Sequence, residues 1–320
     1  MDIFLSNQVL IFLFSESILY LLSFIAFLGA FSILRKWDFS AHTTAQYNLE
    51  KKAFLIVTII FFTLILKIIL LPYFAYTIDK LALLIPGAMC GAGVISANIY
   101  GNPLLALKII ILFCVGIWLI INHLDQKAIN YPYFKTKFWF YLFIFTLLSI
   151  EYGLDIAYFS NISTKDVVQC CSVIFGISGS NTIAFNLTVT MLLVIFYVLY
   201  SLTILLSIQK NSLLLFVVSL LFFYIGYQSV VHFFGTYIYQ LPTHKCPFCM
   251  LQKEYYYVGY FVWSSLFIGV FFGISNFLLK LLIHHEEPTL YRYTIIFNTI
   301  FVILCSSYVF VYYIKNGVWL

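Results

Sequence analysis

The chain has 320 residues, of which 63% are hydrophobic, 20% aromatic and only 9% charged, with a net charge of +5. Soluble domains carry roughly 25% charged residues, so this chain lacks the polar side chains that would coat a water-facing globule. The composition excludes a soluble enzyme, a nucleic-acid-binding protein and a disordered chain. It indicates instead a polytopic protein of the lipid bilayer, whose positive charge lies in the loops.

Eight segments are apolar over about the 20 residues that a helix needs to cross a bilayer. They are 9–34, 53–74, 104–121, 138–154, 183–208, 212–234, 256–282 and 294–314. The first segment has no basic region before it and ends at Arg35 and Lys36 instead of a small-residue cleavage site, so we interpret it as a retained helix and not a secretory signal. No linker divides the chain, which predicts one all-α bundle over residues 1–320 without a separate soluble domain.

The basic residues predict the orientation, because loops rich in Lys and Arg stay in the cytoplasm. One set of alternate loops holds ten: Arg35, Lys36, Lys51, Lys52, Lys127, Lys135, Lys137, Lys210, Lys280 and Arg292. The other set holds five: Lys80, Lys165, Lys245, Lys253 and Lys315. We therefore expect a bacterial inner-membrane protein with both termini outside the cytoplasm. Three long loops, 75–103, 155–182 and 235–255, then lie on the outer face.

The seven cysteines fall into two groups. Cys114 and Cys305 lie inside predicted helices, where a thiol is a small apolar filler. The other five all fall in outer loops: Cys90 in the first, Cys170 and Cys171 in the second, Cys246 and Cys249 in the third. The outer side of a bacterial membrane is oxidising, so cysteines there are paired, catalytic or metal-bound.

The third outer loop contains a Cys-x-x-Cys motif formed by Cys246 and Cys249. Pro247 suits the first position of a helix, which predicts Cys246 at the N-cap and Cys249 in the first turn of the seventh membrane helix. The partial positive charge of a helix N-terminus stabilises a thiolate, and Lys245 and His244 add charge nearby. The pattern predicts a reactive dithiol.

The stretch Cys246-Pro-Phe-Cys249-Met-Leu-Gln252-Lys253 resembles the quinone-coupled membrane thiol oxidases of the disulfide-bond-formation protein B type. Their pattern is Cys-x-x-Cys, two residues, Gln or Glu, and then Arg. The resemblance implies that Cys246 and Cys249 are a redox pair, that Lys253 stands where the family has Arg, and that a quinone accepts the electrons.

The resemblance also implies a second set of cysteines that exchanges with an extracytoplasmic thiol protein. In this chain that set has to come from Cys90, Cys170 and Cys171. These cysteines precede the motif, whereas the family has four membrane helices and a second pair after it. In the vitamin K epoxide reductase family, the loop cysteines precede the membrane Cys-x-x-Cys motif, as they do here.

An aromatic cluster follows the motif and has two interpretations. Tyr255, Tyr256, Tyr257, Tyr260 and Trp263 are typical of the belt at a membrane interface. The same side chains could line a flat quinone or haem pocket beside Gln252 and Lys253, with Tyr256 and Tyr260 as the contact residues.

Metal binding and a static disulfide are the other interpretations of the Cys246 and Cys249 pair. Together with Cys90, the residues His244 and Met250 would supply thiolate, imidazole and thioether ligands, which copper(I) or zinc would select. The sequence favours a membrane thiol–disulfide oxidoreductase. The alternatives are a binding or transport protein for a soft metal or haem, and a structural subunit of a membrane complex.

Ionisable residues inside membrane helices are costly and point to function. Five of them lie near the predicted outer ends of the first four helices: Glu16, Lys67, Lys108, Glu151 and Asp155. We expect the two lysines to snorkel to the interface, because their chains are long enough. Glu16 is the better candidate for pairing with a lysine or for relaying a proton.

Overall fold

The computed structural model describes residues 3–38, 43–128, 130–164, 166–168 and 187–320. Its described residues form helices, turns and loops, with no strand among them. Eight of the described helices are long and apolar enough to cross a membrane. The prediction of an all-α polytopic membrane protein is confirmed.

The contacts between residues divide the chain into two compact units. The sequence predicts a single bundle over residues 1–320. Unit 1 comprises Met1–Lys80 and Ile95–Asp166, and unit 2 comprises Leu81–Val94 and Val167–Leu320. The polypeptide thus leaves unit 1 after residue 80, returns at residue 95 and leaves again after residue 166. No Pro- or Ser-rich linker marks these crossings, so composition could not reveal them.

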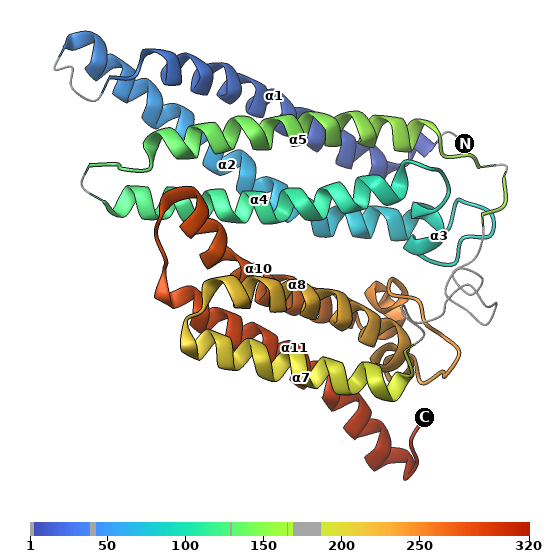
Figure 1. The fold of residues 1–320 in the computed structure, drawn as a ribbon. Helices are drawn as coiled ribbons and strands as arrows, with labels where there is room; N and C mark the ends of the chain where they lie inside the picture. The colour runs from blue at the N-terminus through green and yellow to red at the C-terminus, as the bar shows by residue number, and fades with distance from the viewer. Residues whose placement is uncertain (1–2, 39–42, 129, 165, 169–186) are drawn as a thin grey trace. The chain divides into compact units, whose positions relative to one another are not determined.

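Unit 1 contains four spanning helices (Figure 1). They are α1 (Asn7–Lys36), α2 (Thr44–Leu81, of which the last residue belongs to unit 2), α4 (Gly101–Lys127) and α5 (Phe134–Ser160). Helix α5 packs against α1 and α4, around a core that includes Ile60, Trp118 and Tyr141. A short 3-10 turn, η1 (Ile3–Leu5), precedes α1.

Unit 2 contains the other four spanning segments (Figure 1). They are α7 (Val189–Gln209), the continuous run of α8 (Ser212–Ser229), π-helical η3 (Val230–Phe234) and α9 (Gly235–Tyr239), then α10 (Val258–Ile283) and α11 (Pro288–Asn316). Helix α10 packs against α8 and α11, and α7 packs against the same two helices. Among its described residues, unit 2 also contains three short elements: α3 (Gly91–Ile95), whose last residue belongs to unit 1, and the 3-10 turns η4 (Cys249–Leu251) and η5 (Lys253–Tyr255).

Several helices extend beyond the apolar segments that predict them, whereas α7 and α10 begin after the predicted residues 183 and 256. Helix α2 begins nine residues before the predicted residue 53, and α11 begins at Pro288 instead of residue 294. Hydrophobicity marks the part of a helix that lies in hydrocarbon, whereas hydrogen bonding continues into the polar flanks. Pro288 is a natural start, because its fixed φ suits the first helical turn and it has no N–H to leave unpaired.

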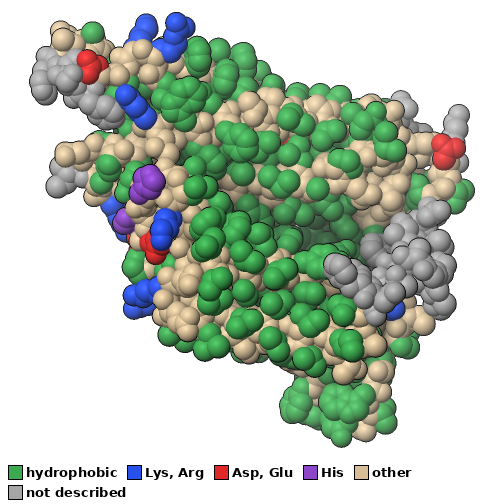
Figure 2. Space-filling view, viewed as in Figure 1, with side chains coloured by type: hydrophobic (Ala, Val, Ile, Leu, Met, Phe, Trp, Pro, Cys, Tyr) green, Lys and Arg blue, Asp and Glu red, His purple; other side chains and the backbone are tan. Residues whose placement is uncertain are grey.

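The outer surface of the helices is apolar, the reverse of a soluble protein. Large side chains such as Phe54, Phe62 and Phe261 are more than 60% exposed, whereas Ser219 and Asn298 are fully buried. Figure 2 shows hydrophobic side chains over the middle of the helices and Lys and Arg near their ends. This distribution is the one that a bilayer requires, and the chain is a multi-pass membrane protein.

Gly269 permits a close approach between α10 and α11. A Cβ added there would lie 2.0 Å from Oδ1 and 3.0 Å from the backbone nitrogen of Asn298. Small residues at such crossings let membrane helices pack backbone to backbone.

The substitution Gly269→Ala should lower the thermal stability of the protein in detergent, because overpacking of this kind typically costs about 1–3 kcal/mol. Gly153→Ala in α5 is the matched control, since no atom lies within 4 Å of the added Cβ. Helix propensity should make that control neutral or slightly stabilising. Thermal unfolding followed by circular dichroism checks this, and equal melting temperatures for the two variants would contradict it.

Candidate functional site

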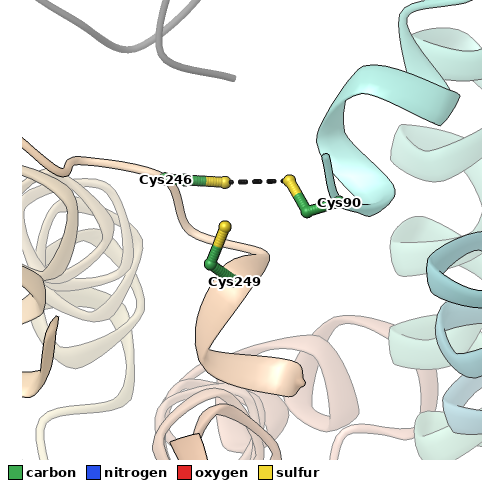
Figure 3. Close-up of side chains that lie close together, drawn as sticks. All are labelled: Cys90, Cys246 and Cys249. Carbon is green, nitrogen blue, oxygen red and sulfur yellow. Dashed lines mark hydrogen bonds between the residues drawn. The ribbon is translucent and has the colours of Figure 1, made fainter. Parts of the chain in front are cut away.

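Three cysteines that are far apart in the sequence lie together in unit 2 (Figure 3). The Sγ atoms of Cys90 and Cys246 are 3.3 Å apart, and the Sγ atoms of Cys90, Cys246 and Cys249 all lie within 4.8 Å of one another. Their exposed fractions are 0%, 2% and 5%. We call these three residues the cysteine cluster. Cys90 immediately precedes α3, Cys246 lies in the loop after α9, and Cys249 begins η4.

The Cys-x-x-Cys motif does not begin the membrane helix, so that prediction is wrong. Cys249 starts a three-residue 3-10 turn, η5 follows, and α10 begins only at Val258. Tyr256 and Tyr257 have φ values of 53° and 57°, and this left-handed backbone ends any helical path from the motif into α10. Cys249 therefore does not lie in the first turn of α10.

Tyr239, the last residue of α9, holds the motif at both ends. Its buried hydroxyl donates to the carbonyl oxygen of Cys246 and accepts the N–H of Met250 at 3.0 Å. From α10, the indole Nε1 of Trp263 donates to the carbonyl oxygen of Pro247 at 3.1 Å. These bonds satisfy backbone groups of a loop that has no regular secondary structure to do so.

Gly259 lets the motif pack on α10. A Cβ at this position would lie 2.5 Å from Cγ and 2.9 Å from the carbonyl carbon of Met250. Because one of these atoms belongs to the backbone, a larger residue would displace η4 and with it Cys249.

Cys90 is held beside the motif by hydrogen bonds from two directions. The Gln252 side-chain amide donates to the carbonyl oxygen of Met89 at 3.3 Å. The Val168 N–H donates to the carbonyl oxygen of Pro86 at 2.9 Å. Gly87, with φ of 82°, turns the chain between these contacts. The loop before α3 is thus fixed on the loop after α9, which explains the contact between the sulfurs of Cys90 and Cys246.

A backbone N–H is directed at the sulfur of Cys246. The backbone N–H of Phe248 points at Cys246 Sγ over 3.4 Å, and an N–H donor stabilises a thiolate. On the other side of the motif, partial burial and then the charge of Cys249 raise the pKa of the Tyr255 hydroxyl. Tyr255 also packs edge-on against Tyr239, with ring centroids 4.8 Å apart.

The residues predicted to contact a quinone occupy different environments. Gln252 is half-buried and joins the two loops, and Tyr260 is half-buried on α10. Lys253 is exposed, and Tyr256 is 91% exposed. The described residues do not show these four side chains enclosing a pocket with the cysteines.

The other predicted residues also have defined positions. Met250 is fully buried next to the motif, and the His244 ring packs on Tyr239 with centroids 4.3 Å apart. His244 Nε2 is buried without a hydrogen-bond partner, but it is not part of the group of close sulfur ligands. Cys170 and Cys171 lie outside the described residues. Cys114 and Cys305 lie within α4 and α11, inside helices as predicted.

Sequence reasoning missed Tyr239, and it assigned Trp263 only to the interfacial belt. Neither the spacing of Tyr239 from Cys246 nor its residue type is a known signal of a motif. Its role follows from the fold of the loop, which places its hydroxyl between two backbone groups.

Comparison with known proteins gives no relative: no family model, curated protein or solved structure matches this chain.

The substitution Tyr239→Phe should loosen the motif, because it removes the buried hydrogen bonds that the hydroxyl makes to the Cys246 carbonyl and the Met250 N–H, at a cost of about 1–3 kcal/mol. We expect a lower melting temperature and faster alkylation of Cys246 and Cys249 by a thiol reagent. Tyr237→Phe, two residues earlier in α9, is the control, since the Tyr237 hydroxyl accepts from Leu320 N–H. Equal alkylation rates in the two variants would remove Tyr239 from the site.

Proposed function

We propose that this protein is a membrane-embedded thiol–disulfide oxidoreductase that oxidises an extracytoplasmic dithiol and passes the electrons to a quinone. The distance of 3.3 Å between the sulfurs of Cys90 and Cys246, with Cys249 beside them, carries the proposal. A disulfide bond is about 2.05 Å long, so a shift of about 1 Å would allow Cys90 to bond to Cys246. One thiol beside a Cys-x-x-Cys pair is the arrangement that thiol–disulfide exchange requires.

The exchange begins with a disulfide between Cys246 and Cys249. The Cys90 thiolate attacks Cys246 Sγ, forms the Cys90–Cys246 disulfide and releases Cys249 as a thiolate, which takes a proton. The thiolate of Cys170 or Cys171 then attacks the buried Cys90, and Cys246 leaves as a thiolate beside the Phe248 N–H. A partner thiolate takes the place of Cys90 in this disulfide, and the second partner thiol displaces the loop cysteine and completes the disulfide of the partner.

Reduction of a quinone returns the protein to its starting state. Cys246 and Cys249 form their disulfide again and deliver two electrons and two protons, which convert the quinone into a quinol. The net reaction oxidises one dithiol and reduces one quinone. Gln252, Lys253, Tyr256 and Tyr260 follow the motif directly, and the exposed Lys253 and Tyr256 are open to a lipid-soluble quinone that arrives from the bilayer.

Electrons need a route to Cys90, because this residue is fully buried. The sequence offers Cys170 and Cys171 in the second outer loop for exchange with the partner protein. The excess of basic residues in the alternate loops supports the orientation that this scheme needs. It would place both termini and the three cysteine-bearing loops on the extracytoplasmic side of a bacterial inner membrane.

Single serine variants of the full chain, with Cys114→Ser as the control, test this proposal. In Cys249→Ser membranes treated with a mild thiol oxidant, mass spectrometry after alkylation should find a disulfide between Cys90 and Cys246, because Cys249 is no longer there to displace Cys90. Reduced wild-type protein and Cys114→Ser should convert a short-chain quinone to quinol, whereas Cys246→Ser should fall to background. If Cys249→Ser contains no Cys90–Cys246 disulfide and wild type forms no quinol, the proposal is wrong.

A soft-metal site is the second candidate function, supported by three buried sulfurs within 4.8 Å of one another. Three thiolates suit copper(I), and zinc would need a fourth ligand such as His244 or Met250. In this case the purified protein should hold one copper or zinc ion per chain, and the metal should protect all three cysteines from alkylation. Cys90→Ser should lose the metal. Protein without metal whose cysteines exchange disulfides would exclude this candidate, and inert cysteines without metal would favour a structural subunit.

A further inference from the structure

Five charged side chains form a buried cluster in the spanning helices of unit 1. They are Glu16 of α1, Lys67 of α2, Lys108 of α4, and Glu151 and Asp155 of α5. Lys67 is the most exposed of them, at 9% of its side chain, and Asp155 is fully buried. The prediction that Lys67 and Lys108 snorkel is wrong, and the pairing predicted for Glu16 is confirmed.

Each ammonium group lies among carboxylate oxygens. Lys67 Nζ lies 2.8 Å from both oxygens of Glu16 and 2.7 Å from Glu151 Oε2. Lys108 Nζ lies 2.7 Å from Glu151 Oε1, 2.9 Å from Asp155 Oδ2 and 3.5 Å from Glu16 Oε1. It also lies over the rings of Phe12 and Phe74. Each ammonium group thus has one carboxylate oxygen for each of its three N–H bonds. These contacts keep both lysines charged.

The charges of the cluster do not balance. Three carboxylates face two ammonium groups, which leaves one excess negative charge when all five groups are ionised. An uncompensated charge buried in an apolar surrounding is strongly unfavourable, and a carboxylate in that position takes up a proton instead. The cluster is neutral when it holds one proton.

The contacts single out Asp155 as the carboxylate that takes the proton. Glu16 and Glu151 each contact both lysines, whereas Asp155 contacts only Lys108, through Oδ2. Its other oxygen, Oδ1, is buried and has no hydrogen-bond partner. A proton on Oδ1 therefore breaks no ion pair. Outside the five charged groups, Tyr158, further along α5, also interacts with Asp155.

A small cavity adjoins the cluster. It has a volume of about 20 Å³ and is lined by Glu16, Lys67, Lys108 and Glu151 among aliphatic side chains. A space of this size with polar walls can hold one water molecule. One oxygen from each of Glu16, Glu151 and Asp155 lies within 4.8 Å of the other two, a separation that a water molecule can bridge by hydrogen bonds to both sides.

We propose that unit 1 contains a proton-binding site within the membrane, in which Asp155 holds an exchangeable proton among Glu16, Glu151 and the two lysines. Release of this proton converts the cluster from neutral to singly negative. The ligand is a proton, and the function is proton uptake and release inside the bilayer. This site stands independently of the thiol chemistry of unit 2.

Infrared difference spectroscopy of the full protein in lipid vesicles, between mildly alkaline and mildly acidic pH, tests the proposal. Wild type should show the carbonyl stretch of one un-ionised carboxylic acid in an apolar surrounding, with a shift in D₂O. Asp155→Asn should lose this band, and it should fold well because it copies the charge of the protonated state. Glu254→Gln, at an exposed position, is the control that keeps the band.

A second variant tests the charge count itself. Glu151→Gln leaves two carboxylates and two ammonium groups, so Asp155 should remain ionised and the band should disappear although Asp155 is present. A band that survives in Asp155→Asn or in Glu151→Gln would overturn the proposal, as would its absence from wild type at every pH. Loss of the wild-type band on addition of sodium at fixed pH would show that the site takes a metal cation instead.

Discussion

Hydrocarbon offers a polar group neither a hydrogen-bond partner nor a dielectric that weakens charge, and this constraint governs both units. The backbone satisfies its own amides in helices, and the surface that faces outward is made of side chains such as Phe54 and Phe261. Any charged residue within a span must find its counterpart on another helix. In unit 1 this requirement brings together Glu16, Lys67 and Lys108 from three helices, together with Glu151 and Asp155 from the fourth. The cluster has one carboxylate more than it has ammonium groups, so the same requirement places a proton on one carboxylate.

The sequence was sufficient for the parts of the fold that this constraint determines. Eight apolar segments predict eight spans, and the similar depth of the charged residues in the first four spans is a signal that they meet. The ends of the helices were harder to predict, because the hydrogen bonding of α2 continues well beyond its apolar segment. The structure around Cys249 was predicted wrongly for a different reason. Pro247 is compatible with a helix start, but the left-handed Tyr256 and Tyr257 separate the motif from α10, and no propensity rule predicts two consecutive non-glycine residues in that region.

The cysteine cluster depends on tertiary structure that the sequence does not encode locally. Cys90 and Cys246 are 156 positions apart, and the segment that carries Cys90 belongs to unit 2 although the helices before and after it belong to unit 1. Their meeting rests on the hydrogen bond from Gln252 to the Met89 carbonyl and on the Tyr239 hydroxyl that shapes the motif. The sequence could assign the cysteines to one face of the membrane, because it could count spans. The distances between the sulfurs could not be predicted, because they depend on side chains such as Gln252 and Tyr239, whose roles no sequence pattern indicates.

The distance between the sulfurs also bears on the choice between exchange and metal binding. Two thiolates bound to one zinc ion, each at about 2.3 Å, lie about 3.8 Å apart in tetrahedral geometry and about 4.0 Å apart in trigonal geometry. The sulfurs of Cys90 and Cys246 are closer than either value, at 3.3 Å. Two thiolates would repel each other at this separation without a cation between them, whereas a thiol can donate to a thiolate. An odd number of thiols also suits exchange, because one of the three always remains to attack the disulfide that the other two form.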